Sequence, residues 1–125
     1  MGDKKCILIV DDEPDVIKWL TVLFTENGYD TEAAYDGLEG FEKAVARVPD
    51  LITLDVSMPR DSGIKMYDKL LKDETTKHIP VIMVTAAPPQ LGVFLDRMKT
   101  KKAPAAFLEK PVNEQELLQK IKDLI

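Results

Sequence analysis

Five polar residues of the sequence stand at the ends of short runs of apolar and β-branched residues. They are three carboxylates, one hydroxyl and one ammonium group: Asp11, Asp12, Asp55, Thr85 and Lys110. If those runs are parallel strands, their carboxyl ends lie along one edge of a sheet, where open α/β sheets bind ligands. A single aspartate at a strand end is most often a helix cap, but this combination favours a chemical site.

The charges of that group favour a divalent cation. Three ionised carboxylates and one lysine sum to about −2, and like charges at close range repel one another strongly at low effective dielectric. Oxygen ligands suit Mg²⁺, whereas Cys6 and His78 are the only residues of their kinds and cannot form a zinc set. Magnesium beside a lysine and a threonine is suited to phosphoryl transfer, in which a carboxylate can be the nucleophile. Glu13 is expected to favour the start of the next helix.

The apolar runs alternate with helical stretches. Buried parallel strands are predicted at 7–10, 51–54 and 81–84, and weaker ones at 31–34 and 105–108. Apolar residues three or four positions apart predict four helices, with inward stripes Val16-Leu20-Leu23-Phe24, Leu38-Phe41-Val45-Val48, Ile64-Tyr67-Leu70-Leu71 and Leu117-Ile121-Leu124. A fifth, short helix is expected from about 91 to 98, within an irregular segment from 86 to 104. Right-handed crossovers would close these five β-α units into one parallel sheet with helices on both faces.

Helix ends are marked by residues with specific capping roles. Pro14 suits the first turn of the first helix, and Gly28 suits its C-terminal cap. Asp36 can cap the second helix, and Asn113 with Glu116 resembles a capping box for the last.

Composition limits the class of protein. The chain has 125 residues, of which 45% are apolar and 31% charged, as expected for one globular domain. A net charge of −5 argues against nucleic acid as a direct partner. No apolar run approaches the ~20 residues of a membrane span, so no membrane insertion is expected. A single cysteine excludes an internal disulfide and suits the cytoplasm.

Together these residues resemble the receiver domain of two-component response regulators, over the whole chain from 1 to 125. The resemblance rests on Ile7-Leu8-Ile9-Val10-Asp11-Asp12-Glu13-Pro14, Pro49-Asp50-Leu51, Leu54-Asp55, Met58-Pro59, Gly63, Val84-Thr85-Ala86, Phe107 and Lys110-Pro111. It implies a flavodoxin-like, doubly wound parallel sheet with strand order 2-1-3-4-5 and five helices, the fourth short or irregular.

The resemblance also implies a role for each site residue. Asp55 would accept a phosphoryl group from a histidine of a sensor kinase or of a histidine phosphotransfer protein. Asp11, Asp12, Asp55 and the backbone carbonyl of Ser57 would hold Mg²⁺. Lys110 would pair with Asp55 and then with a phosphoryl oxygen, and a cis peptide is expected between it and Pro111.

A conformational switch is implied as well. Thr85 would reorient to bond a phosphoryl oxygen, and Phe107 would rotate as Thr85 moves. The domain would then change its binding to an unknown downstream protein or to an output domain missing from this sequence. Such a domain is a signalling phosphoacceptor, not an enzyme.

Two other functions stay open at this point. A Mg²⁺-dependent phosphohydrolase also uses an aspartate nucleophile, but Ser57 stands where its second aspartate would act as acid and base. A binding domain that has lost phosphorylation is disfavoured because all five expected polar positions are filled.

Overall fold

The computed structural model of the protein describes residues 4–86, 96 and 102–125, apart from the side chains of Asp61 and Thr85. Five parallel strands form one sheet in the order β2-β1-β3-β4-β5, which confirms the predicted topology. The strands are β1 (Cys6–Val10), β2 (Asp30–Ala34), β3 (Leu51–Asp55), β4 (Val81–Thr85) and β5 (Ala106–Glu109). The predicted strand bounds are correct to within one residue.

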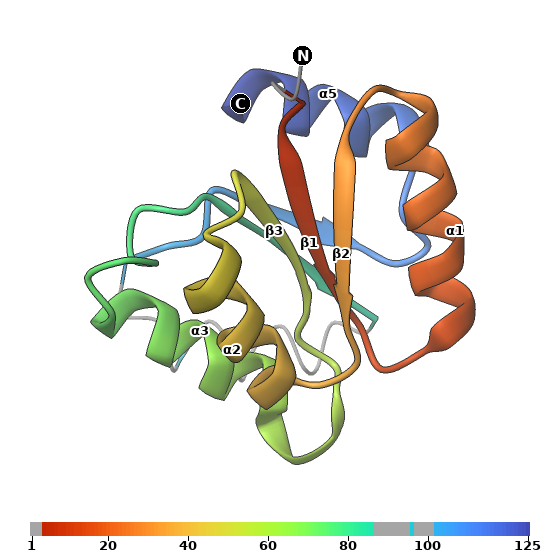
Figure 1. Cartoon of the computed structure of the whole chain (residues 1–125). Coiled ribbons are helices and arrows are strands. Elements are labelled where there is room, and N and C mark those ends of the chain that lie inside the picture. Colours follow the sequence, from red (N-terminus) through yellow and green to blue (C-terminus); the bar gives the residue numbers. More distant parts are fainter. Residues whose placement is uncertain (1–3, 87–95, 97–101) are drawn as a thin grey trace.

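The described helices cover both faces of the sheet. They are α1 (Pro14–Glu26), α2 (Gly37–Arg47), α3 (Ser62–Lys72) and α5 (Glu114–Leu124), with a short 3-10 helix, η1 (Pro59–Asp61), before α3. Helices α1 and α5 pack on one face and α2 and α3 on the other (Figure 1). The expected helix at 91–98 lies outside the described residues except for Asp96, so the labels pass from α3 to α5.

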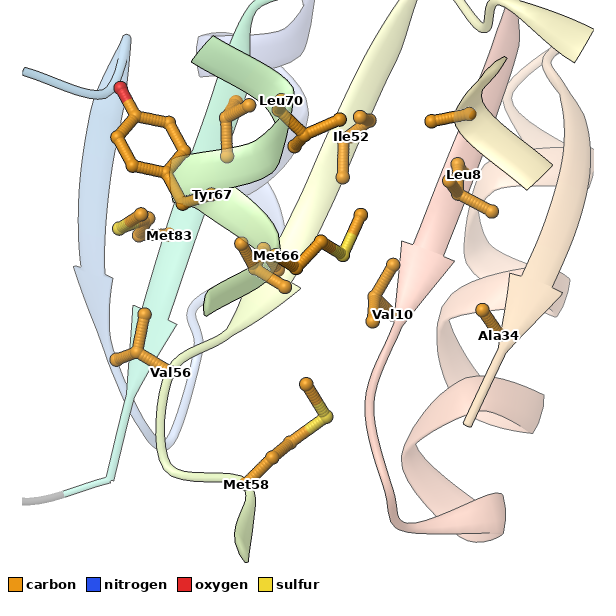
Figure 2. Close-up of a cluster of buried hydrophobic side chains, with 13 residues drawn as sticks. Leu8, Val10, Ala34, Ile52, Val56, Met58, Met66, Tyr67, Leu70 and Met83 are labelled. Atoms are coloured by element: carbon orange, nitrogen blue, oxygen red, sulfur yellow. The ribbon is translucent and has the colours of Figure 1, made fainter. Parts of the chain in front are cut away.

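Alternation along the strands divides the core into two layers. On β1, Ile7 and Ile9 face α1 and α5, whereas Leu8 and Val10 face α2 and α3. Figure 2 shows the second layer, in which Met66 and Tyr67 and their neighbours from α3 lie against the strands. Burial of each large apolar side chain in these layers contributes about 1.5–3 kcal/mol to the free energy of folding. Helices are therefore packed firmly on both faces of the sheet, and this packing holds the ends of the strands in place.

The predicted inward face of α2 is wrong. Three of its four residues are exposed, by 61, 38 and 50%: Leu38, Val45 and Val48. The buried residues are instead small: Gly37, Gly40 and Ala44. The reason is the close approach of α2 to α3, since a Cβ atom at Gly40 would lie 2.7 Å from the sulfur of Met66. The stripes of α1 and α5 need smaller corrections, because Ile17 is more buried than Val16 and Leu124 is exposed.

The predicted helix ends are confirmed with one shift. Pro14 opens α1, and the side chain of Asp36 accepts a hydrogen bond of 2.8 Å from the amide of Glu39. Asn113 accepts one of 2.9 Å from the amide of Glu116. The C-cap of α1 is Asn27, and Gly28 follows it with a φ of 90°. None of the helices in the described part of the chain is long and apolar enough to cross a membrane.

The end of α2 is strained at Val48. This residue caps the helix with φ 44° and ψ 71°, in the left-handed region, although it is β-branched. That conformation costs an L-residue other than glycine about 1–2 kcal/mol. The side chain is half exposed and gains little from burial.

Val48→Gly is therefore expected to raise the free energy of unfolding by about 1 kcal/mol, because glycine adopts a positive φ without strain. Urea unfolding measures the change. Val22→Gly is the matched control, since Val22 is equally exposed but lies within α1, where glycine should instead lower stability by about 0.5 kcal/mol. Equal losses in both variants would contradict the strain.

Candidate functional site

The acidic residues meet where β1 and β3 end side by side. Val10 pairs with Leu54 in the sheet, so Asp11 and Asp55 leave neighbouring strands at the same level. Because β2 and β4 lie on opposite sides of this pair, the site is at the switch point of the topology. One carboxylate oxygen from each of Asp11, Asp12 and Asp55 lies within 4.8 Å of the others.

Lys110 reaches the same place from the end of β5. Its ammonium nitrogen lies 3.3 Å from Oδ2 of Asp11 and 3.3 Å from Oδ2 of Asp55. Oε1 of Glu13 is 3.6 Å away, whereas no side-chain cap bond from Glu13 to α1 is found in the structure. Glu13 therefore contributes a further negative charge near the lysine. The Lys110–Pro111 peptide is cis, as expected.

The backbone after each strand fixes its carboxylate. The amide of Ser57 donates a hydrogen bond of 2.8 Å to Oδ1 of Asp55, and the Ser57 hydroxyl donates to the same oxygen. The amide of Glu13 donates one of 2.9 Å to Oδ1 of Asp11. Both are Asx-turns, in which an aspartate bonds the backbone two residues later. Each buried carboxylate thus has one oxygen held by its own turn and the other facing Lys110.

A glycine lets α3 approach the end of β3. A Cβ atom at Gly63 would lie 2.4 Å from the carbonyl oxygen of Asp55 and 3.1 Å from Cα of Val56. The first distance is shorter than a Cβ atom and an oxygen atom tolerate, so a larger residue would displace the loop. The close packing of α3 therefore requires glycine at this position.

The site holds more negative charge than Lys110 offsets. Burial, and then the negative charge of Asp55, raise the pKa of Asp11 to about 6. The hydrogen bond from the Glu13 amide and the charge of Lys110 lower that pKa, but by less. Burial alone would lower the pKa of Lys110, but the Asp55 and Asp11 carboxylates outweigh it and raise that pKa. Asp11 is therefore mostly ionised at neutral pH, but its ionisation is less favourable in the folded chain than in the unfolded chain.

Asp11→Asn is expected to stabilise the metal-free protein at pH 8, by about 2 kcal/mol. The pKa of Asp11 is about 6 in the folded chain and about 4 in the unfolded chain. The cost in stability is therefore absent below about pH 4, grows as the pH rises from about 4 to about 6, and stays constant above that. Urea unfolding in EDTA from pH 4 to 8 measures the difference. The exposed Asp30→Asn is the control, and a stability gain independent of pH would contradict the assignment.

The other two residues expected at the site, Thr85 and Phe107, lie on β4 and β5. Thr85 ends β4, opposite Glu109 of β5. Phe107, on β5, is partly buried against the layer between the sheet and α2 and α3. The roles expected for the Thr85 hydroxyl, the Phe107 ring and the Ser57 carbonyl stay predictions.

Two contacts of this site do not follow from the predictions made on the sequence. Ser57 is expected to provide only a carbonyl ligand, whereas its amide and hydroxyl hold Asp55. Glu13 is expected to favour the start of α1, whereas its carboxylate lies beside Lys110. The first contact had a local signal, since aspartate in a turn commonly bonds the amide two residues on. The contact between Glu13 and Lys110 depends on where β5 ends, so no local pattern in the sequence could have indicated it.

Comparisons with known proteins agree with this geometry. The sequence model of the response regulator receiver domain matches residues 7–122. The chain is 36% identical over 120 residues to the DNA-binding dual master transcriptional regulator RpaA of Synechocystis sp., covering 95% of this chain and 48% of that protein. It is 35% identical over 116 residues to the protein PilH of Pseudomonas aeruginosa, covering 92% of this chain and 93% of that protein.

The fold is also found among solved structures. The chemotaxis protein CheY4 of Vibrio cholerae superposes with a TM-score of 0.83 at 25% identity, over 98% of this chain and 99% of that one. The chain thus spans about half of RpaA and nearly all of PilH and CheY4. From its fold, its site and these matches, the chain belongs to the response regulator receiver domain family, the phosphoacceptor domains of two-component signal transduction.

Proposed function

We propose that Asp55 is the phosphoacceptor and takes its phosphoryl group from a histidine of a sensor kinase or of a histidine phosphotransfer protein. The observation that supports this most is the position of Lys110, whose ammonium lies 3.3 Å from both Asp55 and Asp11. A carboxylate held by Ser57 and facing a lysine is oriented for attack before the donor arrives.

In the proposed step, an oxygen of Asp55 bonds to phosphorus while the P–N bond to the donor histidine breaks. The electron pair of that bond leaves with the imidazole, which takes up a proton, and Asp55 becomes an acyl phosphate. Ser57 holds Oδ1 in place during attack. Lys110 would then pair with a phosphoryl oxygen, an interaction between charged groups that is stronger than a neutral hydrogen bond.

The cation of this site is proposed to be Mg²⁺. Carboxylate oxygens of Asp11, Asp12 and Asp55 come within 4.8 Å of one another, and burial, followed by the Asp55 charge, raises the pKa of Asp11. These residues, with the Ser57 carbonyl, would hold the ion. Bound Mg²⁺ would offset the negative charge of the transferring phosphoryl group.

The output is proposed to be a population shift. Thr85 would bond a phosphoryl oxygen and Phe107 would rotate, at the β4-β5 edge of the sheet. A shift from mostly inactive to mostly active needs about 5.5 kcal/mol of differential interaction. A few bonds to charged groups, at about 1.5–3 kcal/mol each, would supply it.

The proposed domain is a signalling module from 1 to 125 that assists only its own phosphorylation and dephosphorylation. Its output would pass through a downstream protein or an attached domain, without direct binding of this domain to nucleic acid. A cytoplasmic location is part of the proposal and is compatible with the free thiol of Cys6.

Incubation with acetyl phosphate and Mg²⁺, followed by intact mass measurement, tests the acceptor. The wild-type chain should gain the mass of one phosphoryl group, and Asp55→Asn should gain none, because the nucleophile is lost. Asp30→Asn, an exposed carboxylate of β2, should behave as wild type. Phosphate release without an adduct would instead indicate a phosphohydrolase. If the chain gives no adduct and releases no phosphate, it is a phosphorylation-independent binding domain.

Thermal unfolding with and without Mg²⁺ tests the metal. An ion that binds only the folded state stabilises it by mass action, by about 2.7 kcal/mol at a hundred times its Kd. The Mg²⁺-dependent rise in Tm should be large in wild type and in Asp30→Asn, and much smaller in Asp12→Asn. Equal rises in all three proteins would show that Mg²⁺ acts elsewhere.

A further inference from the structure

A surface groove of about 440 Å³ lies where helices α2 and α3 run side by side (Figure 1). The two helices are close at one end of it, since the amide of Gly37 donates a hydrogen bond of 2.5 Å to the Ser62 hydroxyl. Among the described residues that line the groove, none belongs to the proposed phosphoacceptor site. The lining includes the side chains of Leu38, Arg60, Lys65, Asp68, Lys69 and Lys72. It is called the α2–α3 groove below.

One wall of the groove is a row of lysines on α3. Lys65, Lys69 and Lys72 follow one another at spacings of four and three residues, which places them on one side of the helix. All three are exposed, and none forms an ion pair within the described part of the chain. Arg60 of η1 adds a fourth cation. Asp68 is the only carboxylate among the described lining residues, so their net charge is +3.

The other wall is apolar and belongs to α2. Leu38 is exposed and is followed at helical spacing by Phe41, which is partly buried, and by Val45, which is exposed. The Phe41 ring lies beside the lysine row, because the ammonium nitrogen of Lys69 is 5.7 Å from its centre. The apolar stripe that the sequence predicts to face the core therefore borders the groove instead. Exposed apolar residues that are grouped and rimmed by polar ones are typical of interaction sites.

We propose that the α2–α3 groove binds an acidic amphipathic helix of a partner protein. Apolar side chains of that helix would contact Leu38 and Phe41, and its carboxylates would pair with Lys65, Lys69 and Lys72. A helix presents side chains at i, i+4 and i+7 on one side, which is the spacing of the three lysines, and it docks into a groove through its apolar face. The chain as a whole carries a charge of −5, so a groove of opposite sign attracts an acidic segment to this place.

Charge and shape disfavour other occupants of the groove. A second copy of the chain would bring the same lysines together in a symmetric contact, where like charges repel. Nucleic acid would bind the cations but leave the apolar stripe of α2 in water, and the net charge of −5 opposes its approach. An anionic membrane surface is flat on this scale and would reach the rim of the groove but not the partly buried Phe41 ring.

The probe is a synthetic helical peptide of about 12 residues, or roughly three turns. It carries leucines along one side, glutamates beside them and alanines elsewhere. Titration of the full chain with this peptide should shift the methyl resonances of Leu38 and Val45 in a ¹H–¹³C spectrum in a saturable way. The indole resonance of Trp19, which packs on the opposite face of the sheet, should not move. A control peptide with glutamine in place of each glutamate should bind about tenfold more weakly.

Matched substitutions separate the groove from general attraction of an acidic peptide. Lys65→Glu reverses one charge of the row and should weaken binding about fivefold, whereas Lys120→Glu makes the same change at an exposed position of α5 and should have less than about a twofold effect. Leu38→Gln removes an apolar contact and should weaken binding about tenfold. Val22→Gln makes a similar change at an exposed position of α1 and should not. All four positions are exposed, so the variants should keep the fold.

The absence of a saturable shift at Leu38 would overturn the proposal. Equal affinity for the glutamate and glutamine peptides would show that charge plays no part, and equal effects of Lys65→Glu and Lys120→Glu would place the peptide elsewhere. Shifts at Leu38 that grow with protein concentration alone would indicate self-association instead. Shifts caused by anionic vesicles or by a DNA duplex, but not by the peptide, would assign the groove to a membrane or to nucleic acid. Phosphorylation of Asp55 does not enter the experiment, so its outcome is independent of the proposed phosphoacceptor function.

Discussion

The ammonium group of Lys110 between Asp11 and Asp55 is the interaction on which this site depends. Both carboxylates are 3% exposed, and two buried like charges without a cation would cost several kcal/mol. One lysine offsets only part of that charge, since burial and Asp55 still raise the pKa of Asp11 to about 6. The folded chain thus holds an excess of negative charge at this site, and this excess favours the binding of a cation.

The sheet provides the geometry that this charge arrangement needs. The central strands β1 and β3 are paired in register, so their carboxyl ends present Asp11 and Asp55 side by side. The Asx-turns then fix one oxygen of each carboxylate, at Glu13 and Ser57. The other oxygen of each carboxylate faces Lys110. Local backbone geometry and sheet topology therefore both determine how Asp11 and Asp55 are placed.

Much of this arrangement could be predicted from sequence because it depends on local patterns and sheet topology. The strands, the helix caps and the cluster of Asp11, Asp12 and Asp55 follow from such patterns. The buried face of α2 could not be predicted, because α2 approaches Met66 of α3 closely through Gly40, whereas the larger Leu38 is exposed. Periodicity identifies an apolar stripe but not the neighbour that a helix meets.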